Sequence, residues 1–157
     1  MSEEGSLTIV STSTEETQAL GRRLAPALQA GDLIALEGPL GAGKTCFVQG
    51  LAQGLAVAGR VASPTFIVMR CHPGPVTLYH ADAYRLSSAE ELLDVGLEDW
   101  LGQGVVALEW ADRVAEALPL DHLTVRLEGR DHERRITMTA HGPRSRELLE
   151  HLRPCVS

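Results

Sequence analysis

Residues 38–45 read Gly38-Pro39-Leu40-Gly41-Ala42-Gly43-Lys44-Thr45. This stretch, called the phosphate loop below, matches the pattern G-x-x-x-x-G-K-[ST], in which glycines and a helix N-terminus surround phosphate groups. The pattern needs a strand before it and a helix after it. Residues 33–36 are a short apolar run typical of a buried strand, and apolar residues recur at helical spacing over 47–55. The sequence therefore predicts a strand, a loop and a helix that together bind a phosphorylated ligand.

The residue types of the phosphate loop suit a nucleoside triphosphate. Its glycines leave room for backbone N–H groups to converge on phosphate oxygens. We expect Lys44 to reach the β- and γ-phosphates and the Thr45 hydroxyl to ligate magnesium. Cys46 follows at the α-phosphate position, where many such loops carry a second hydroxyl residue. The nucleotide-binding residues predicted in this segment are Gly38, Leu40, Gly41, Ala42, Gly43, Lys44, Thr45 and Cys46.

Lys44 is the only lysine of the chain, because the other 13 of its 14 basic residues are arginine. A compact ammonium differs chemically from a planar guanidinium, so this single exception suggests a local need for the smaller cation. The alternative is a glycine-rich turn that caps a helix and leaves Lys44 in solvent. Such a turn would need neither the lysine nor the adjacent threonine.

The composition is that of one globular domain. The chain has 157 residues, of which 44% are apolar and 22% charged, so we expect a single domain over 1–157 with a core over about 7–152. The net charge of −7 argues against tight autonomous binding to nucleic acid.

The sequence also carries no sign of export. No apolar run approaches the roughly 20 residues that span a bilayer. The acidic N-terminus lacks the features of a signal peptide. The three cysteines form no C-x-x-C pair and are expected to be reduced thiols. A cytoplasmic protein is expected.

The hydrophobic pattern predicts an α/β fold with a mixed central β-sheet flanked by helices and antiparallel C-terminal strands. The four residues 13–16 have capping-box spacing, so a helix should begin there, and Pro26 should bend or shorten it. Strands are expected over 7–10, 33–36, 66–70, 76–80, 105–108, 123–127 and 135–139. Further helices are expected after the phosphate loop and around 89–94, 98–101 and 148–152, with a hairpin turn over 71–75.

Two carboxylates are candidates for the metal and for catalysis. Glu109 follows the apolar run 105–108, which places it at the C-terminal tip of a strand, where ligands of open α/β sheets bind. We expect it to be the acid on the metal side, with Asp82 as the second acid. His80 shares a strand face with Asp82 and is more often a structural histidine than a catalytic one. Arg85 could approach a phosphate or pair with a surface carboxylate.

Five segments follow one another along the chain: Leu40-Gly41-Ala42-Gly43-Lys44-Thr45, Ser63-Pro64-Thr65-Phe66, His80-x-Asp82-x-Tyr84-Arg85-Leu86, Asp94-Val95-Gly96-Leu97-Glu98 and Leu108-Glu109-Trp110-Ala111. Together they resemble the TsaE family, formerly called YjeE, the small bacterial ATPase of tRNA threonylcarbamoyladenosine biosynthesis. The phosphate loop alone is generic, whereas S-P-T-F, H-x-D-x-Y-R and E-W at these intervals are specific to the family. The resemblance covers nearly the whole chain. One departure is that alanines flank Asp82 where bulkier apolar residues are common.

The resemblance implies a role for each of several residues. It implies that ATP and Mg²⁺ are bound by Lys44 and Thr45, with Glu109 completing the magnesium site. Thr65, within Ser63-Pro64-Thr65, would belong to a switch-like loop that senses the γ-phosphate. Asp82 would serve catalysis, together with Lys44 and Thr65, and Trp110 would lie beside the nucleotide. For Trp110, a purely structural role at the start of a helix is about equally compatible with the sequence.

The resemblance also implies two partner proteins, TsaB and TsaD, which transfer threonylcarbamoyl to adenosine 37 of tRNA. ATP hydrolysis by the small subunit would reset that complex, and the chain would meet tRNA only through it. Two alternatives remain open at this stage. One is a small-molecule kinase on the same fold, and the other is a nucleotide-binding regulatory scaffold without turnover.

Overall fold

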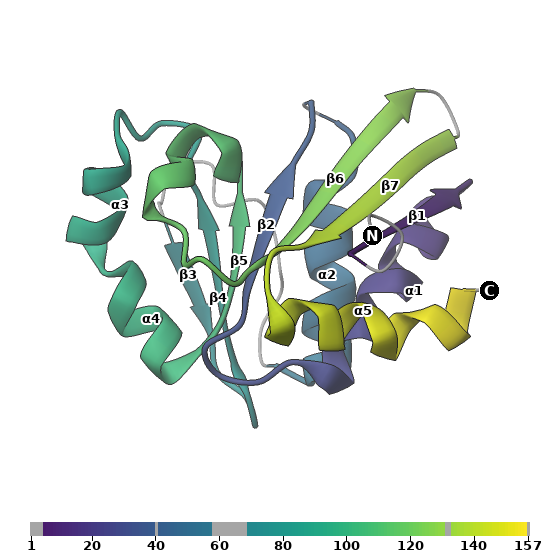
Figure 1. Cartoon of the computed structure of the whole chain (residues 1–157), viewed down its shortest axis with the longest axis horizontal. Helices are drawn as coiled ribbons and strands as arrows, with labels where there is room; N and C mark the ends of the chain where they lie inside the picture. The colour runs from purple at the N-terminus through teal and green to yellow at the C-terminus, as the bar shows by residue number, and fades with distance from the viewer. Residues whose placement is uncertain (1–4, 40, 58–68, 131–132, 157) are drawn as a thin grey trace.

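The computed structural model describes residues 5–39, 41–57, 69–130 and 133–156, and these form a seven-stranded sheet with the order β1-β7-β6-β2-β5-β4-β3 (Figure 1). The strands are β1 (Ser6–Ser11), β2 (Leu33–Glu37), β3 (Met69–His72), β4 (Thr77–Asp82), β5 (Gly104–Glu109), β6 (Leu123–Arg130) and β7 (Glu133–Ala140). β6, β2, β5 and β4 run parallel, while β1, β7 and β3 are antiparallel to their neighbours. This is the predicted mixed sheet, and the C-terminal ends of β2, β4 and β5 meet at one edge.

Helices cover both faces of the sheet because its central strands are apolar on both sides. Ile34 and Leu36 of β2 pack in one core with α1 (Thr14–Leu24), α2 (Lys44–Leu55) and α5 (Pro143–Val156). Leu33 and Ala35 point the other way, into a core with α3 (Ala89–Val95), α4 (Leu97–Gln103) and the 3₁₀ segment η2 (Ala111–Ala117). Figure 1 shows the two groups of helices well apart.

The predicted start of the first helix and the predicted effect of Pro26 are confirmed. The Ser13 hydroxyl caps α1 by accepting a hydrogen bond from the Glu16 backbone N–H, at 3.0 Å. The α-helix ends at Leu24 and continues as a 3₁₀ turn, η1 (Ala25–Ala27), with Pro26 inside it. Pro26 therefore shortens the helix, as its missing N–H requires.

The predicted hairpin turn at 71–75 is wrong at its start. Cys71 and His72 belong to strand β3 and pair with Tyr79 and Leu78 of β4. The sequence misleads because a cysteine and a histidine carry no strong strand preference, whereas the Pro73-Gly74-Pro75 stretch after them has the residue types of a turn. Residues 66–68, where the strand was expected to begin, lie outside the described residues.

Helices α1 and α2 approach each other closely through glycines. A Cβ on Gly50 of α2 would collide with the backbone carbonyl of Gln18 on α1, and one on Gly21 of α1 would collide with the carbonyl of Phe47. Glycine is unfavourable inside a helix, so its presence here reflects the close approach. The contact fixes the position of α2, which carries the phosphate loop at its N-terminus.

We expect Gly50→Ala to lower the free energy of unfolding by about 1–3 kcal/mol, because the two helix backbones must separate to admit the methyl group. Gly102→Ala on α4 is the matched control, since a Cβ there meets nothing within 4 Å. That variant should be neutral or slightly stabilising, because alanine favours a helix. Urea unfolding of both variants measures the difference, and equal effects would contradict the role assigned to Gly50.

Candidate nucleotide-binding site

The phosphate loop joins β2 to α2 at the C-terminal edge of the sheet. Gly38 has φ +134° and Gly43 has φ +107°, which are angles that other residues rarely adopt. A Cβ on Gly38 would also collide with the Leu127 carbonyl of β6. Gly41 has φ +81°, so all three predicted loop glycines are required by the backbone itself. Leu40 lies outside the described residues, so its predicted contact stays a prediction.

Lys44 is buried, with 5% of its surface exposed, so the alternative of a solvated lysine is wrong. Its Nζ donates to the carbonyl oxygens of Gly38 at 2.5 Å and Pro39 at 3.2 Å. The ammonium also lies 3.8 Å from the centroid of the Trp110 ring. Burial lowers the pKa of Lys44, while the negative charges of Glu109, Asp82 and Asp112 act in the opposite direction. The phosphate loop therefore surrounds the ammonium group of Lys44.

Thr45, Glu109 and His80 form a connected group beside this cation. The Thr45 hydroxyl donates to Glu109 Oε2 at 3.0 Å, and His80 Nε2 lies 2.6 Å from the same oxygen. Glu109 is 3% exposed and His80 is fully buried. Thr45 and Glu109, the two residues predicted to hold magnesium, are therefore in direct contact.

The contact between His80 and Glu109 was missed by sequence reasoning, which favoured an ordinary structural histidine. The strand alternation places His80 and Asp82 on one face of β4, and the register sets Asp82 opposite Glu109 of β5. The order of the strands in the sheet decides which strand lies beside β4, and therefore which side chains lie next to His80 and Asp82. Within residues 5–39, 41–57, 69–130 and 133–156, the buried Nδ1 of His80 has no hydrogen-bond partner.

Asp82 ends β4 next to this group. Its Oδ1 accepts a hydrogen bond from the Tyr84 backbone N–H at 2.8 Å. Desolvation raises the pKa of Asp82, and the negative charge of Glu109 adds to the shift. The Tyr84 N–H, His80 and Lys44 favour the ionised carboxylate and oppose it. Asp82 is therefore a half-buried acid close to the cation, as a catalytic acid or base would be.

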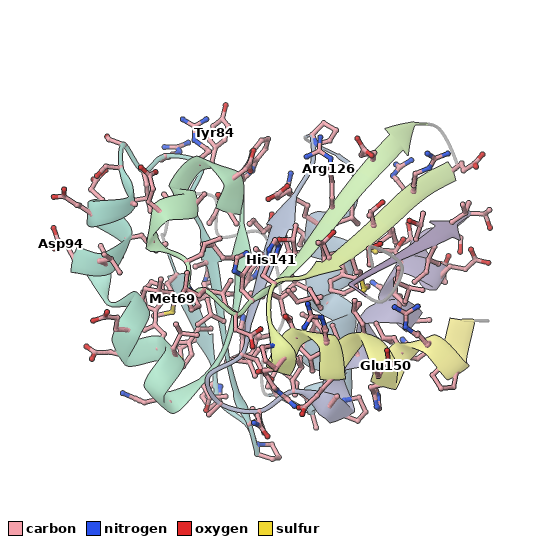
Figure 2. All side chains as sticks on the ribbon, in the orientation of Figure 1. Met69, Tyr84, Asp94, Arg126, His141 and Glu150 are labelled. Carbon is pink, nitrogen blue, oxygen red and sulfur yellow. The ribbon has the colours of Figure 1, made fainter. Side chains whose placement is uncertain are left out.

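Trp110 has a left-handed backbone, with φ +60°, at the turn from β5 into η2. Such a conformation costs a bulky residue on the order of 1–2 kcal/mol, so the surrounding contacts must hold it. The Tyr84 ring packs against the indole with 5.0 Å between centroids, and Arg113 lies over Tyr84. Figure 2 shows Tyr84 and Arg126 on the same edge of the molecule, the one toward which β2 points in Figure 1.

The remaining predicted residues are distributed as follows. Ala42 is buried and Gly41 is exposed. The Cys46 thiol donates to the Thr14 carbonyl oxygen at 3.2 Å. Thr65 and the rest of Ser63-Pro64-Thr65-Phe66 lie outside the described residues. The structure thus brings together Lys44, Thr45, Asp82, Glu109 and Trp110.

The donor set fits a magnesium nucleotide. An ammonium suits phosphate oxygens, and a hydroxyl next to a carboxylate offers the hard oxygen ligands that Mg²⁺ prefers. In the described part of the chain, no group of three or more His, Cys, Asp or Glu side chains could hold a metal ion. A magnesium ion that takes most of its ligands from phosphates and water needs no such group.

Parallel central strands, a glycine loop before a buried lysine and an acid at the end of the adjacent strand define the class of phosphate-loop nucleotide-binding domains. The family model described as "Threonylcarbamoyl adenosine biosynthesis protein TsaE" matches residues 11–137. The chain belongs to the TsaE family, as its motifs suggested. Neither alternative, the small-molecule kinase or the regulatory scaffold, finds support in these matches.

Curated relatives and one solved structure agree with the family match. The tRNA threonylcarbamoyladenosine biosynthesis protein TsaE of Bacillus subtilis is 43% identical over 141 residues, which cover 88% of each chain. The protein of the same name from Streptomyces coelicolor is 45% identical over 135 residues, covering 80% of this chain and 90% of the relative. The crystal structure of Bacillus subtilis YdiB superposes with a TM-score of 0.84 at 35% identity, over 97% of both chains.

None of the helices in the described residues has the length and the apolar content that crossing a membrane would require.

Replacing Asp82 tests the electrostatics of the site. Because burial raises the pKa of Asp82, its ionised form is less favourable in the folded protein than in the unfolded chain. We expect Asp82→Asn to increase the free energy of unfolding at pH 7. This gain should shrink as the pH falls through the raised pKa, since wild-type Asp82 then takes up a proton. Urea unfolding at pH 7 and pH 4 measures both effects.

Asp94→Asn, at an exposed position of α3, removes the same charge far from the site and should change stability little. A loss of stability at pH 7 in Asp82→Asn, without any loss in Asp94→Asn, would contradict the electrostatic account.

Proposed function

We propose that the chain is a magnesium-dependent ATPase that serves tRNA threonylcarbamoyladenosine biosynthesis. One observation carries the proposal: the lone lysine of the phosphate loop is buried beside a hydroxyl and a carboxylate that already contact each other. This arrangement offers a cation for transferred phosphate and two oxygen ligands for a metal ion. Such charges stabilise the transition state of phosphoryl transfer.

Lys44 exchanges its present acceptors for phosphate. Its Nζ now donates to two loop carbonyls, and on binding it donates to the β- and γ-phosphate oxygens. The helix N-terminus at Lys44 adds its positive dipole end. Lys44 is held for this task by the Trp110 ring, which excludes water from one side of the ammonium.

Thr45 and Glu109 are the residues that would hold magnesium. The bound ion supplies charge neutralisation on the phosphates. Glu109 Oε2 is shared by the Thr45 hydroxyl and His80 Nε2, so two contacts orient the carboxylate. His80 acts here as a positioning residue, in the way that second partners commonly fix metal-binding carboxylates.

Asp82 is proposed as the group that orients the attacking water. Its carboxylate lies on the strand next to Glu109, and an ionised carboxylate at this place can accept a hydrogen bond from the attacking water. Thr65 is proposed to sense the γ-phosphate within the Ser63–Phe66 switch. The family resemblance is the support for that assignment.

Hydrolysis is proposed to be slow in the isolated chain and faster with partner proteins of the TsaB and TsaD type. Phosphate-loop enzymes often receive a stabilising cation from a partner, which raises turnover by several orders of magnitude. ATP turnover would reset the transfer complex between cycles. The net charge of −7 agrees with contact to tRNA only through that complex.

We expect Glu109→Gln to raise the Mg²⁺ concentration needed for half-maximal ATP hydrolysis at least tenfold, about 1.4 kcal/mol. Glutamine keeps the size of the side chain but loses the charge that attracts the cation. Glu116→Gln on η2 is the matched control, because it removes a charge from an exposed position. Magnesium titrations of hydrolysis measure both, and identical curves for the two variants would remove Glu109 from the metal site.

Lys44→Ala should lower ATP affinity or turnover at least tenfold, about 1.4 kcal/mol, because the chain has no second lysine to replace it. In a bacterial cell depleted of the protein, wild type should restore threonylcarbamoyladenosine in tRNA, whereas Lys44→Ala should not. Mass spectrometry of tRNA nucleosides gives the readout. Full rescue by Lys44→Ala would overturn an ATP-driven role.

Hydrolysis is measured in parallel with the isolated chain and with the two partner proteins plus tRNA. Acceleration in the mixture supports the partner-activated ATPase. Equal rates in both measurements would show that hydrolysis does not depend on the partners, and they would contradict partner activation.

A further inference from the structure

Tyr84 is an exposed aromatic residue that contacts the site at two points. Its backbone N–H donates to Asp82 Oδ1 at 2.8 Å. Its ring packs against the indole of Trp110, with 5.0 Å between the centroids and 55° between the planes, although Tyr84 is 53% exposed. Figure 2 shows Tyr84 at the outer edge of the molecule. The first contact uses the backbone alone, so only the contact with the indole depends on the aromatic side chain.

The sheet brings Tyr84 and Trp110 together. Asp82 and Glu109 are register partners at the ends of β4 and β5. The Ala83 N–H then donates to the Glu109 carbonyl oxygen at 3.0 Å, which extends the pairing by one residue. Tyr84 and Trp110 are the next residues of the two segments, so their backbones leave the sheet side by side.

Arg113 contacts the same tyrosine ring from η2. Its backbone N–H donates to the Trp110 carbonyl oxygen at 3.1 Å, which closes a 3₁₀ turn. Its guanidinium carbon lies 5.3 Å from the centroid of the Tyr84 ring, within the range of a cation–π contact. The turn therefore brings both Trp110 and Arg113 to the Tyr84 ring.

The indole of Trp110 joins this ring to the ammonium of Lys44. The Nζ atom lies 3.8 Å from the indole centroid, and Lys44 is 5% exposed. The left-handed backbone of Trp110 is unfavourable for a bulky residue, so side-chain contacts must fix the indole. A cation–π contact is strongest where water is kept from the cation. If the indole turned away, water would reach the ammonium and compete with phosphate oxygens for it.

We propose that Tyr84 is a positioning residue for phosphate binding, because its ring holds the Trp110 indole against the Lys44 ammonium. It acts through Trp110 rather than by contact with the phosphates. The inference rests on the proposed nucleotide binding and adds a residue whose effect is on the phosphate chain.

Quenching of Trp110 fluorescence by acrylamide tests the contact without any nucleotide. The chain has two tryptophans, Trp100 and Trp110, so Trp100→Phe leaves Trp110 as the only indole and keeps a ring against Tyr79. In this background we expect Tyr84→Ala to raise the quenching constant about twofold, because the indole loses the ring that packs on it. Tyr84→Phe keeps that ring and should leave the constant unchanged.

Calorimetric binding of Mg·ATP and of magnesium tripolyphosphate measures the consequence for phosphate. With Trp100 intact, we expect Tyr84→Ala to weaken the binding of both ligands about fivefold, and Tyr84→Phe by less than about twofold. Both variants keep the backbone hydrogen bond to Asp82. Leu120→Ala is the matched control, because it removes a 94% exposed apolar side chain before β6 and should leave both affinities unchanged.

Unchanged quenching of Trp110 in Tyr84→Ala would overturn the proposal, and so would wild-type ATP affinity in that variant. A loss of affinity for ATP but not for tripolyphosphate would overturn it as well, since the effect would then lie on the nucleoside. An equal loss in Tyr84→Phe would assign the effect to the hydroxyl group and contradict the role of the ring.

Thermal unfolding identifies any variant that fails to fold. Tyr84→Leu, which keeps an apolar side chain without an aromatic ring, then replaces Tyr84→Ala in both measurements, with the same expected results. Failure of the wild-type protein to bind ATP would instead contradict the proposed function, whereas the quenching of Trp110 would still decide whether Tyr84 holds the indole.

Discussion

The ammonium of Lys44 is the charge around which the site is built. A cation buried to 5% exposure must find acceptors, because an unpaired charge in the interior costs several kcal/mol. Here the acceptors are the carbonyls of the phosphate loop itself and the face of Trp110. The same contacts explain why Trp110 keeps a left-handed backbone that is otherwise unfavourable.

A second consequence concerns the carboxylates. Glu109 and Asp82 stand at register-paired ends of β5 and β4, which concentrates negative charge at one edge of the sheet. Lys44, the Thr45 hydroxyl and His80 offset this charge in the protein alone, and a magnesium ion would add a further positive charge. The site is therefore preorganised, since its groups are held in place by one another before a ligand arrives.

Much of the fold was predictable from local pattern. The phosphate loop, the capping of α1 by Ser13 and the antiparallel pair β6 and β7 each follow from a few neighbouring residues. The start of the β3–β4 turn was not, because Cys71 and His72 have no strong local preference and join the sheet through pairing with β4. The role of Gly50 was not predictable either, because only the close approach of α1 explains a glycine at this place in a helix.

The sequence by itself determined the class of site: one lysine at the right place in a glycine loop, an acid after an apolar strand, and motifs shared with one family. These features belong to residues that are close together in the chain, so the chemistry of each residue type is enough to interpret them. Only the tertiary structure decided that His80 contacts Glu109 and that Arg134 donates a hydrogen bond to Gly41. Both contacts join residues far apart in sequence, and the order of strands in the sheet, which no local pattern encodes, brings them together.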